Sequence, residues 1–276
     1  ANTLMGFHAG VALTTGQFST FIGSLAGDGH DTESNNVGIG FAALGGAIAG
    51  GEQNVAIGNN SLDALTSGDL NTAIGYGAGG ALTTGAAQIL IGAEAGASLT
   101  SAGGNIAIGY AALDAADTEN NNLAIGEHAL GVCNGGGEYN IAIGKSSLDA
   151  LTSGEYNTVL GYNAGGSVTT GVRNVIIGSN AADTMQQGSS SVIIGDEALG
   201  AGLFTASQAV VIGRNAGSQL TSATGTTLVG FEAGLNQTTG PGNTVLGHKA
   251  VGAGVLTGAN NVVIGKLAGF DMTSGD

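Results

Sequence analysis

The chain has 276 residues, of which 54 are Gly, 9% are charged and 42% are hydrophobic, with a single Pro and no Trp. This composition excludes a disordered chain, and the lone Cys133 excludes a framework of disulfides within the chain. The net charge of −15, with only five scattered Lys and Arg residues, excludes a basic surface for nucleic acid.

A Gly-ended pentapeptide recurs from one end of the chain to the other, as NVAIG at 54–58 and NTAIG at 71–75. Its sixteen final glycines, here called anchor glycines, are spaced 17 or 18 residues apart. They are Gly6, Gly23, Gly40, Gly58, Gly75, Gly92, Gly109, Gly126, Gly144, Gly161, Gly178, Gly195, Gly213, Gly230, Gly247 and Gly265. The spacing leaves no remainder for a separate domain, so we expect residues 1–276 to form one continuous repeat array.

The two ends of the chain fit the same repeat. Joining DMTSGD at the C-terminus to ANTLMG at the N-terminus gives a spacing of 17 residues from Gly265 to Gly6. This continuity indicates either a stretch of a longer array or copies that stack head to tail.

Each anchor glycine follows three residues with the pattern of a short strand. The residue before the glycine is aliphatic in all sixteen repeats, and two residues earlier stands Thr or an aliphatic residue. We expect these two positions to face the inside of a turn. The middle position is expected to face outward, although it is apolar or Gly in every repeat. Because a strand that is apolar on both faces is buried on both faces, the middle positions predict a stripe of contacts between chains. Its larger members are Leu90, Val159, Ile176, Ile193, Val211, Leu228, Val245 and Val263.

Two further positions predict how the turns are built. The anchor glycine fits a corner that needs a positive φ or a close approach of two backbones, for example at Gly58, Gly75, Gly109, Gly126, Gly144 and Gly161. Asn lies four residues before the anchor in 11 of the 16 repeats, which predicts a ladder of stacked amides. Its members include Asn54, Asn71, Asn105, Asn122, Asn140, Asn157 and Asn174. The predicted fold is all-β, a parallel β-solenoid of 16 turns of 17–18 residues, packed or intertwined as a homotrimer.

The repeats also resemble a known family. NVAIG at 54–58, NIAIG at 105–109 and 140–144, and NLAIG at 122–126 are similar to head repeats of trimeric autotransporter adhesins. NTAIGYGAG at 71–79 is similar to Gly-rich repeats of bacteriophage tail-fibre proteins. The resemblance covers the whole chain, and it implies a left-handed parallel β-roll, an obligate homotrimer, a role in attachment, and a location outside the cell or on a virion.

Motifs for catalysis and for cofactors are weak. Gly75, Gly77 and Gly80 satisfy G-x-G-x-x-G, but they lie inside a repeat without a following helix. His8 and His128 are seven turns apart, too far for one chain to bring them to one metal. The cluster of Asp28, His30 and Asp31, and the pair Asp117 and Glu119, read as solvated loops. We therefore expect no catalytic, cofactor or metal residues, no cofactor, and a protein that is not an enzyme.

Two surface patterns suggest binding. Aromatic residues follow some of the anchor glycines and are candidates for stacking on sugars; they are Phe7, Phe41, Tyr76, Tyr110, Tyr162 and Phe231. Pairs of Thr in the LTTG bends, such as Thr14–Thr15 and Thr83–Thr84, suggest ice binding, although intervening turns break the row.

The sequence thus predicts a non-enzymatic extracellular fibrous protein, a trimeric shaft or head of a phage tail fibre or surface adhesin that serves attachment. The alternatives are the protomer of a head-to-tail extracellular filament and, less favoured, an ice-binding solenoid. The expected partners are copies of the chain and a cell-surface carbohydrate or protein. Nucleic acid and membrane insertion are not expected, because no run of about 18 apolar residues occurs.

Overall fold

The structure, a computed structural model, describes residues 1–46, 50–202, 204–205 and 207–274. This part of the chain contains no helix and sixteen strands of three residues each, one per repeat, so the chain is an all-β parallel β-solenoid. The strands are β1 (Thr3–Met5), β2 (Thr20–Ile22), β3 (Val37–Ile39), β4 (Val55–Ile57), β5 (Thr72–Ile74), β6 (Ile89–Ile91), β7 (Ile106–Ile108), β8 (Leu123–Ile125), β9 (Ile141–Ile143), β10 (Thr158–Leu160), β11 (Val175–Ile177), β12 (Val192–Ile194), β13 (Val210–Ile212), β14 (Thr227–Val229), β15 (Thr244–Leu246) and β16 (Val262–Ile264).

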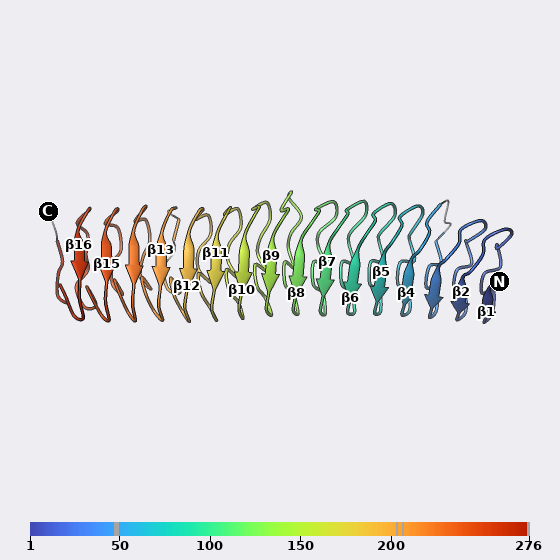
Figure 1. Cartoon of the computed structure of the whole chain (residues 1–276), viewed down its shortest axis with the longest axis horizontal. Coiled ribbons are helices and arrows are strands. Elements are labelled where there is room, and N and C mark those ends of the chain that lie inside the picture. Colours follow the sequence, from blue (N-terminus) through green and yellow to red (C-terminus); the bar gives the residue numbers. More distant parts are fainter. Residues whose placement is uncertain (47–49, 203, 206, 275–276) are drawn as a thin grey trace. The chain divides into compact units, whose positions relative to one another are not determined.

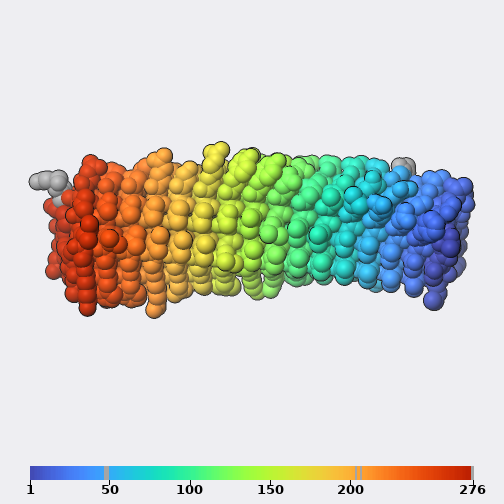
Figure 2. All heavy atoms as spheres, in the orientation of Figure 1, coloured from blue at the N-terminus to red at the C-terminus, as the bar shows by residue number. Residues whose placement is uncertain are grey.

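The chain divides into two compact units, Ala1–Glu138 and Tyr139–Asp276, which hold β1–β8 and β9–β16. Within each unit every strand pairs in parallel with the strand of the next repeat, so that equivalent residues stand side by side (Figure 1). Val55 of β4, for example, is opposite Thr72 of β5, and Ala56 is opposite Ala73. One repeat therefore makes one turn, and each turn forms one layer of a unit (Figure 2).

The corners of a turn depend on backbone conformations that L-residues rarely adopt. All sixteen anchor glycines have φ between +127° and +144°. A Cβ at Gly58 would clash with the carbonyl of Gly75, the anchor of the next turn, so the corner requires glycine for both its conformation and its space. The same conflict exists at Gly75, Gly109, Gly126, Gly144 and Gly161.

Hydrogen bonds between turns continue around the whole circumference and are not confined to the strands. In the turn after Gly58, Leu62 N donates to Ala78 O at 3.1 Å and Thr66 N donates to Thr83 O at 2.8 Å. Equivalent bonds recur in both units. Because nearly every backbone group of a turn points along the stack, the next turn satisfies it, and irregular backbone can be buried without cost.

The middle residue of each strand from β2 to β16 faces the inside of its own turn, which corrects the orientation expected from the sequence. Side chains of seven of the eight predicted inter-chain residues are fully buried within the chain, and Val263 is 9% exposed. The corrected residues are Leu90, Val159, Ile176, Ile193, Val211, Leu228, Val245 and Val263. The first and third residues of the strands, expected inside, lie on the outer surface instead.

Variation in size at the middle position has an internal cause. The fourth residue after the anchor glycine also points into the core, and the two positions complement each other in volume. Gly96 faces Leu90, and a Cβ there would lie 2.8 Å from the Leu90 side chain. Ala56 and Leu62 combine the opposite sizes in their turn, and both are fully buried. The narrow core is thus filled by alternating which side carries the large residue.

Candidate functional surface

The outer surface of the strands is the most regular feature that the protein presents to a partner. We define the outward strand face as the first and third residues of each strand. In the first unit these are Thr3, Met5, Thr20, Ile22, Val37, Ile39, Val55, Ile57, Thr72, Ile74, Ile89, Ile91, Ile106, Ile108, Leu123 and Ile125. In the second unit they are Ile141, Ile143, Thr158, Leu160, Val175, Ile177, Val192, Ile194, Val210, Ile212, Thr227, Val229, Thr244, Leu246, Val262 and Ile264. Every one is Thr, Met or aliphatic, and none carries a charge.

These side chains are open to solvent to different degrees. Leu160 is 46% exposed and Ile264 is 63% exposed, while the flanking residues of most other strands are partly exposed. At about 4.8 Å per strand and about 10 Å across three residues, each unit presents roughly 400 Å² of flat apolar face. A continuous apolar face of this size is characteristic of a surface that associates with a partner.

Aromatic residues that follow the anchor glycines lie at the surface. Phe7 is 69% exposed and Tyr76 is 58% exposed. Phe41, Tyr110 and Tyr162 are each about half exposed, and Phe231 is partly exposed. Three of these rings contact a histidine: Phe7 lies 4.0 Å from His8, Tyr110 lies 5.5 Å from His128, and Phe231 lies 5.2 Å from His248. The histidines and aromatics thus form local pairs and do not gather into one site.

A second aromatic row in the second unit has no counterpart in the sequence-based prediction. The rings of Tyr139 and Tyr156 stack 5.2 Å apart with an interplanar angle of 5°, and the guanidinium of Arg173 lies 5.7 Å from the Tyr156 ring. The three residues occupy the same position in successive turns. Because the rings stack on one another, their faces are covered within the chain, and the row reads as a stabilising ladder.

Buried amides connect successive turns in both units. Asn54 Oδ1 accepts a hydrogen bond from Asn71 N at 2.9 Å, and Asn54 Nδ2 donates to Gly68 O at 2.8 Å. Asn157 and Asn174 repeat this arrangement, with Asn174 N donating to Asn157 Oδ1 at 3.0 Å. Asn105, Asn122 and Asn140 each donate through Nδ2 to a backbone carbonyl of the same turn. Each amide therefore satisfies a backbone donor of one turn and a carbonyl of the bend.

The predicted cluster of Asp28, His30 and Asp31 does not form a site. His30 is fully buried with its ring 4.8 Å from that of Phe21, and neither ring nitrogen has a hydrogen-bond partner in the described residues. Burial lowers the pKa of His30 to about 4, against the opposing influence of Glu33 and Asp31. Asp31 is exposed. His30 therefore occupies a core position that Leu65 and Leu82 fill in other turns.

The second predicted acidic pair, Asp117 and Glu119, forms a backbone clamp. The carboxylate of Glu119, which is 2% exposed, accepts hydrogen bonds from Asp117 N at 2.9 Å, Thr118 N at 3.1 Å and Gly136 N at 2.9 Å. Glu33 makes the equivalent contacts, including 3.0 Å to Gly50 N. In both places the following turn is one residue longer, so the carboxylate supplies the acceptor that a regular neighbour provides elsewhere. The recurring Asp-Thr-Glu was the sequence signal for this clamp.

The second unit has a shallow hollow of about 380 Å³ lined by Asn180, Asp183, Glu197, Gly200, Ala201 and Ser218. Burial raises the pKa of Asp183, and its Oδ1 has no hydrogen-bond partner in the described residues. Throughout the described ranges, no three His, Cys, Asp or Glu side chains lie close enough together to hold a metal ion. Burial also raises the pKa of Cys133 to about 12, which makes its thiol unreactive.

Thr residues of the bends are engaged within the chain. Thr14 Oγ1 donates to Asp31 O at 3.0 Å, Thr83 Oγ1 to Thr100 O at 3.0 Å, and Thr169 Oγ1 to Gln186 O at 3.2 Å. The first hydroxyl of each of these Thr pairs thus binds the next turn. Only the second hydroxyl remains for water or a ligand.

No protein-family model matches this chain, and no curated protein or solved structure matches it either. Within the described residues, no helix has the length and apolar character needed to cross a membrane.

Proposed function

We propose that this chain is a non-enzymatic structural protein that associates with copies of itself through the outward strand face. The observation that carries the proposal is the composition of this face, which is uncharged in all sixteen strands. Both units together offer roughly 800 Å², which is about the area that each partner contributes to a stable protein interface.

Three copies are the proposed number. The face is only two side-chain columns wide, and three such faces around a common axis would cover one another along their full length. The resemblance of NVAIG at 54–58 to head repeats of trimeric adhesins supports the same number. The acidic residues lie outside this face, so association would bury no charge.

The resemblance also supports attachment as the role of the assembly, as part of a phage tail fibre or a surface adhesin, outside the cell or on a virion. A cell-surface carbohydrate or protein is the proposed target. The exposed rings of Phe7, Tyr76 and Tyr162 are the residues most suited to stack on a sugar.

Sedimentation and mass photometry of the chain test the proposal. We expect a particle with the mass of three 26.5 kDa chains and no smaller species at micromolar concentration. A stable, folded monomer would contradict it. Electron micrographs of indefinite filaments would favour the head-to-tail protomer instead, and thermal hysteresis of ice growth would favour ice binding.

A further inference from the structure

Six threonines interrupt the outward strand face, and their hydroxyls have no partner within the chain. They are Thr3, Thr20, Thr72, Thr158, Thr227 and Thr244, the first residues of β1, β2, β5, β10, β14 and β15. None of the six side chains makes a hydrogen bond to any described residue, unlike the Thr residues of the bends. Their backbone groups are used by the sheet, as where Thr72 N donates to Gln88 O at 2.8 Å.

The spacing of these threonines differs from the spacing of the repeat. In the first unit they occupy the first, second and fifth strands, so the separations between them are one, three and four strands. In the second unit they occupy the second, sixth and seventh strands, with separations of four, one and five. No separation recurs within a unit. A copy displaced along the stack by any whole number of strands would therefore place at most one Thr of a unit beside another Thr, whereas zero displacement pairs all three.

We propose that these threonines fix the axial register of the copies, so that parallel chains associate with no offset and each Thr meets the same Thr of its neighbours. This inference rests on the association proposed above. The apolar columns alone cannot set the register, because the first and third strand positions are nearly the same in every turn. Buried polar residues within an apolar interface commonly specify register in this way.

The chemistry of the hydroxyl fits a threefold arrangement. A Thr hydroxyl is one donor and also an acceptor, so three hydroxyls at the same height can each donate to the next and leave no donor unpaired. In a displaced register, most hydroxyls would face Val, Ile or Leu and be buried without a partner, which is unfavourable. With three threonines in each unit, we expect the zero-offset register to exceed any other by more than about ten-fold.

Disulfide trapping between full-length copies tests the register. In a Cys133→Ala background, where Ala116 shows that Ala fits the equivalent core position, Ile57→Cys, Ile74→Cys and Ile91→Cys place reporters on β4, β5 and β6. Chains with different reporters carry tags of different mass and are mixed before they assemble. We expect disulfides between identical reporters and, at a level more than about ten-fold lower, disulfides between reporters one or two strands apart.

Substitution of all six threonines by Val should preserve the fold, because Val37, Val55 and Val175 occupy the same column. In this variant we expect disulfides between different reporters to rise at least about ten-fold. Substitution by Ser, which retains the hydroxyl, should restore the wild-type pattern. Val at the bend positions Thr15, Thr84 and Thr170, which are exposed outside the strands, should leave the pattern unchanged.

The outcomes separate this inference from the association on which it rests. An assembled Val variant with the wild-type pattern, or offset disulfides in the wild type, would overturn the register while leaving association intact. A wild-type chain that is monomeric in sedimentation and forms no disulfides between copies would overturn both.

Discussion

The two units share one fold but differ in the residues that satisfy their polar groups. The first unit, residues 1–138, contains twelve Asp and Glu residues and no Lys or Arg; the second contains eight acidic residues and all five basic ones. Their formal charges are therefore −12 and −3, which together give the −15 of the chain. Strand lengths and corner glycines are nevertheless the same in both.

The partners of the acidic residues differ accordingly. Glu33 and Glu119 of the first unit bind backbone N–H groups, whereas in the second unit Arg214 lies 3.4 Å from Asp196 and Lys249 lies 3.1 Å from Glu232. A β-solenoid thus tolerates large changes in charge because its stability depends on backbone hydrogen bonds between turns and on its core. Ion pairs add little to it.

The largest expected effect is common to both units. Gly58→Ala in the first unit and Gly161→Ala in the second should each lower the free energy of unfolding by at least about 3 kcal/mol, because a Cβ would clash with the next anchor glycine at a φ unfavourable to L-residues. Chemical denaturation measures both. Gly77→Ala is the control: its φ is +62° and no atom lies within 4 Å, so a loss of about 1 kcal/mol is expected. Equal losses at Gly58 and Gly77 would refute the crowded corner.

The backbone clamp is specific to the first unit. Glu119→Ala should reduce stability by about 3 kcal/mol, because it leaves three backbone N–H groups without their charged acceptor. Glu52→Ala, a change at an exposed residue of the same unit, should alter stability by less than about 0.5 kcal/mol. Denaturant titration with hydrogen exchange at Asp117, Thr118 and Gly136 would detect the loss. Unchanged exchange rates at these amides would argue against the clamp.

Buried His30 makes the first unit sensitive to acid. Since its pKa falls from 6.5 in the unfolded chain to about 4 in the folded chain, only the unfolded state binds the proton between these values. Above pH 6.5 the imidazole is neutral in both states. As the pH falls to about 4, folding loses up to about 3 kcal/mol from this residue.

The variant His30→Leu should remove that loss and raise stability at pH 7 by about 2 kcal/mol, since Leu has no unpartnered nitrogen. Thermal melts from pH 7 to pH 4 should show the difference from wild type widening as the pH falls. His248→Gln, at an exposed residue, should follow the wild type. A constant difference across the range would disprove this role of His30.

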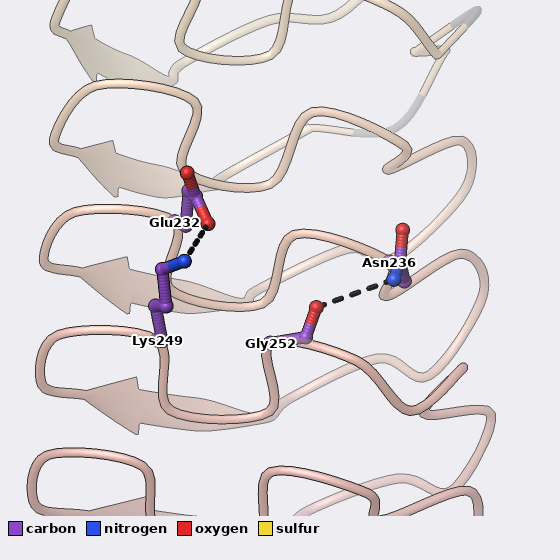
Figure 3. A network of polar contacts seen from close by, with 4 residues as sticks. All are labelled: Glu232, Asn236, Lys249 and Gly252. Atoms are coloured by element: carbon purple, nitrogen blue, oxygen red, sulfur yellow. Dashed lines mark hydrogen bonds and ion pairs between the residues drawn. The ribbon is translucent and has the colours of Figure 1, made fainter.

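The smallest expected effect concerns the ion pairs of the second unit. Lys249→Met removes the contact with Glu232 (Figure 3) and should lower stability by less than about 1 kcal/mol, because the side chains are 37% and 20% exposed. Salt should weaken the effect further. A loss comparable to that of Glu119→Ala would contradict the distinction between the units.

The sequence was sufficient to predict the period, the strand positions and the class of fold, because the 17- and 18-residue spacing of the anchor glycines fixes them. It did not reveal which strand face points inward. A three-residue strand has two faces, and here both are apolar, so alternation alone does not distinguish them. The signal was present in the pairing of Leu90 with Gly96 and of Ala56 with Leu62, since volumes compensate only between residues that share a core.

The account depends most on the direction of the strand faces, and one paired measurement tests it: sedimentation with circular dichroism on Ile57→Glu and Ala56→Glu. A charge at Ile57, on the outward strand face, should leave the chain folded but abolish association, because three carboxylates would meet in an apolar interface. The same charge at Ala56, which is fully buried, should unfold the surrounding turns. If Ile57→Glu retained the mass of the wild-type assembly while Ala56→Glu stayed folded and only dissociated, the assignment of the two faces would be contradicted.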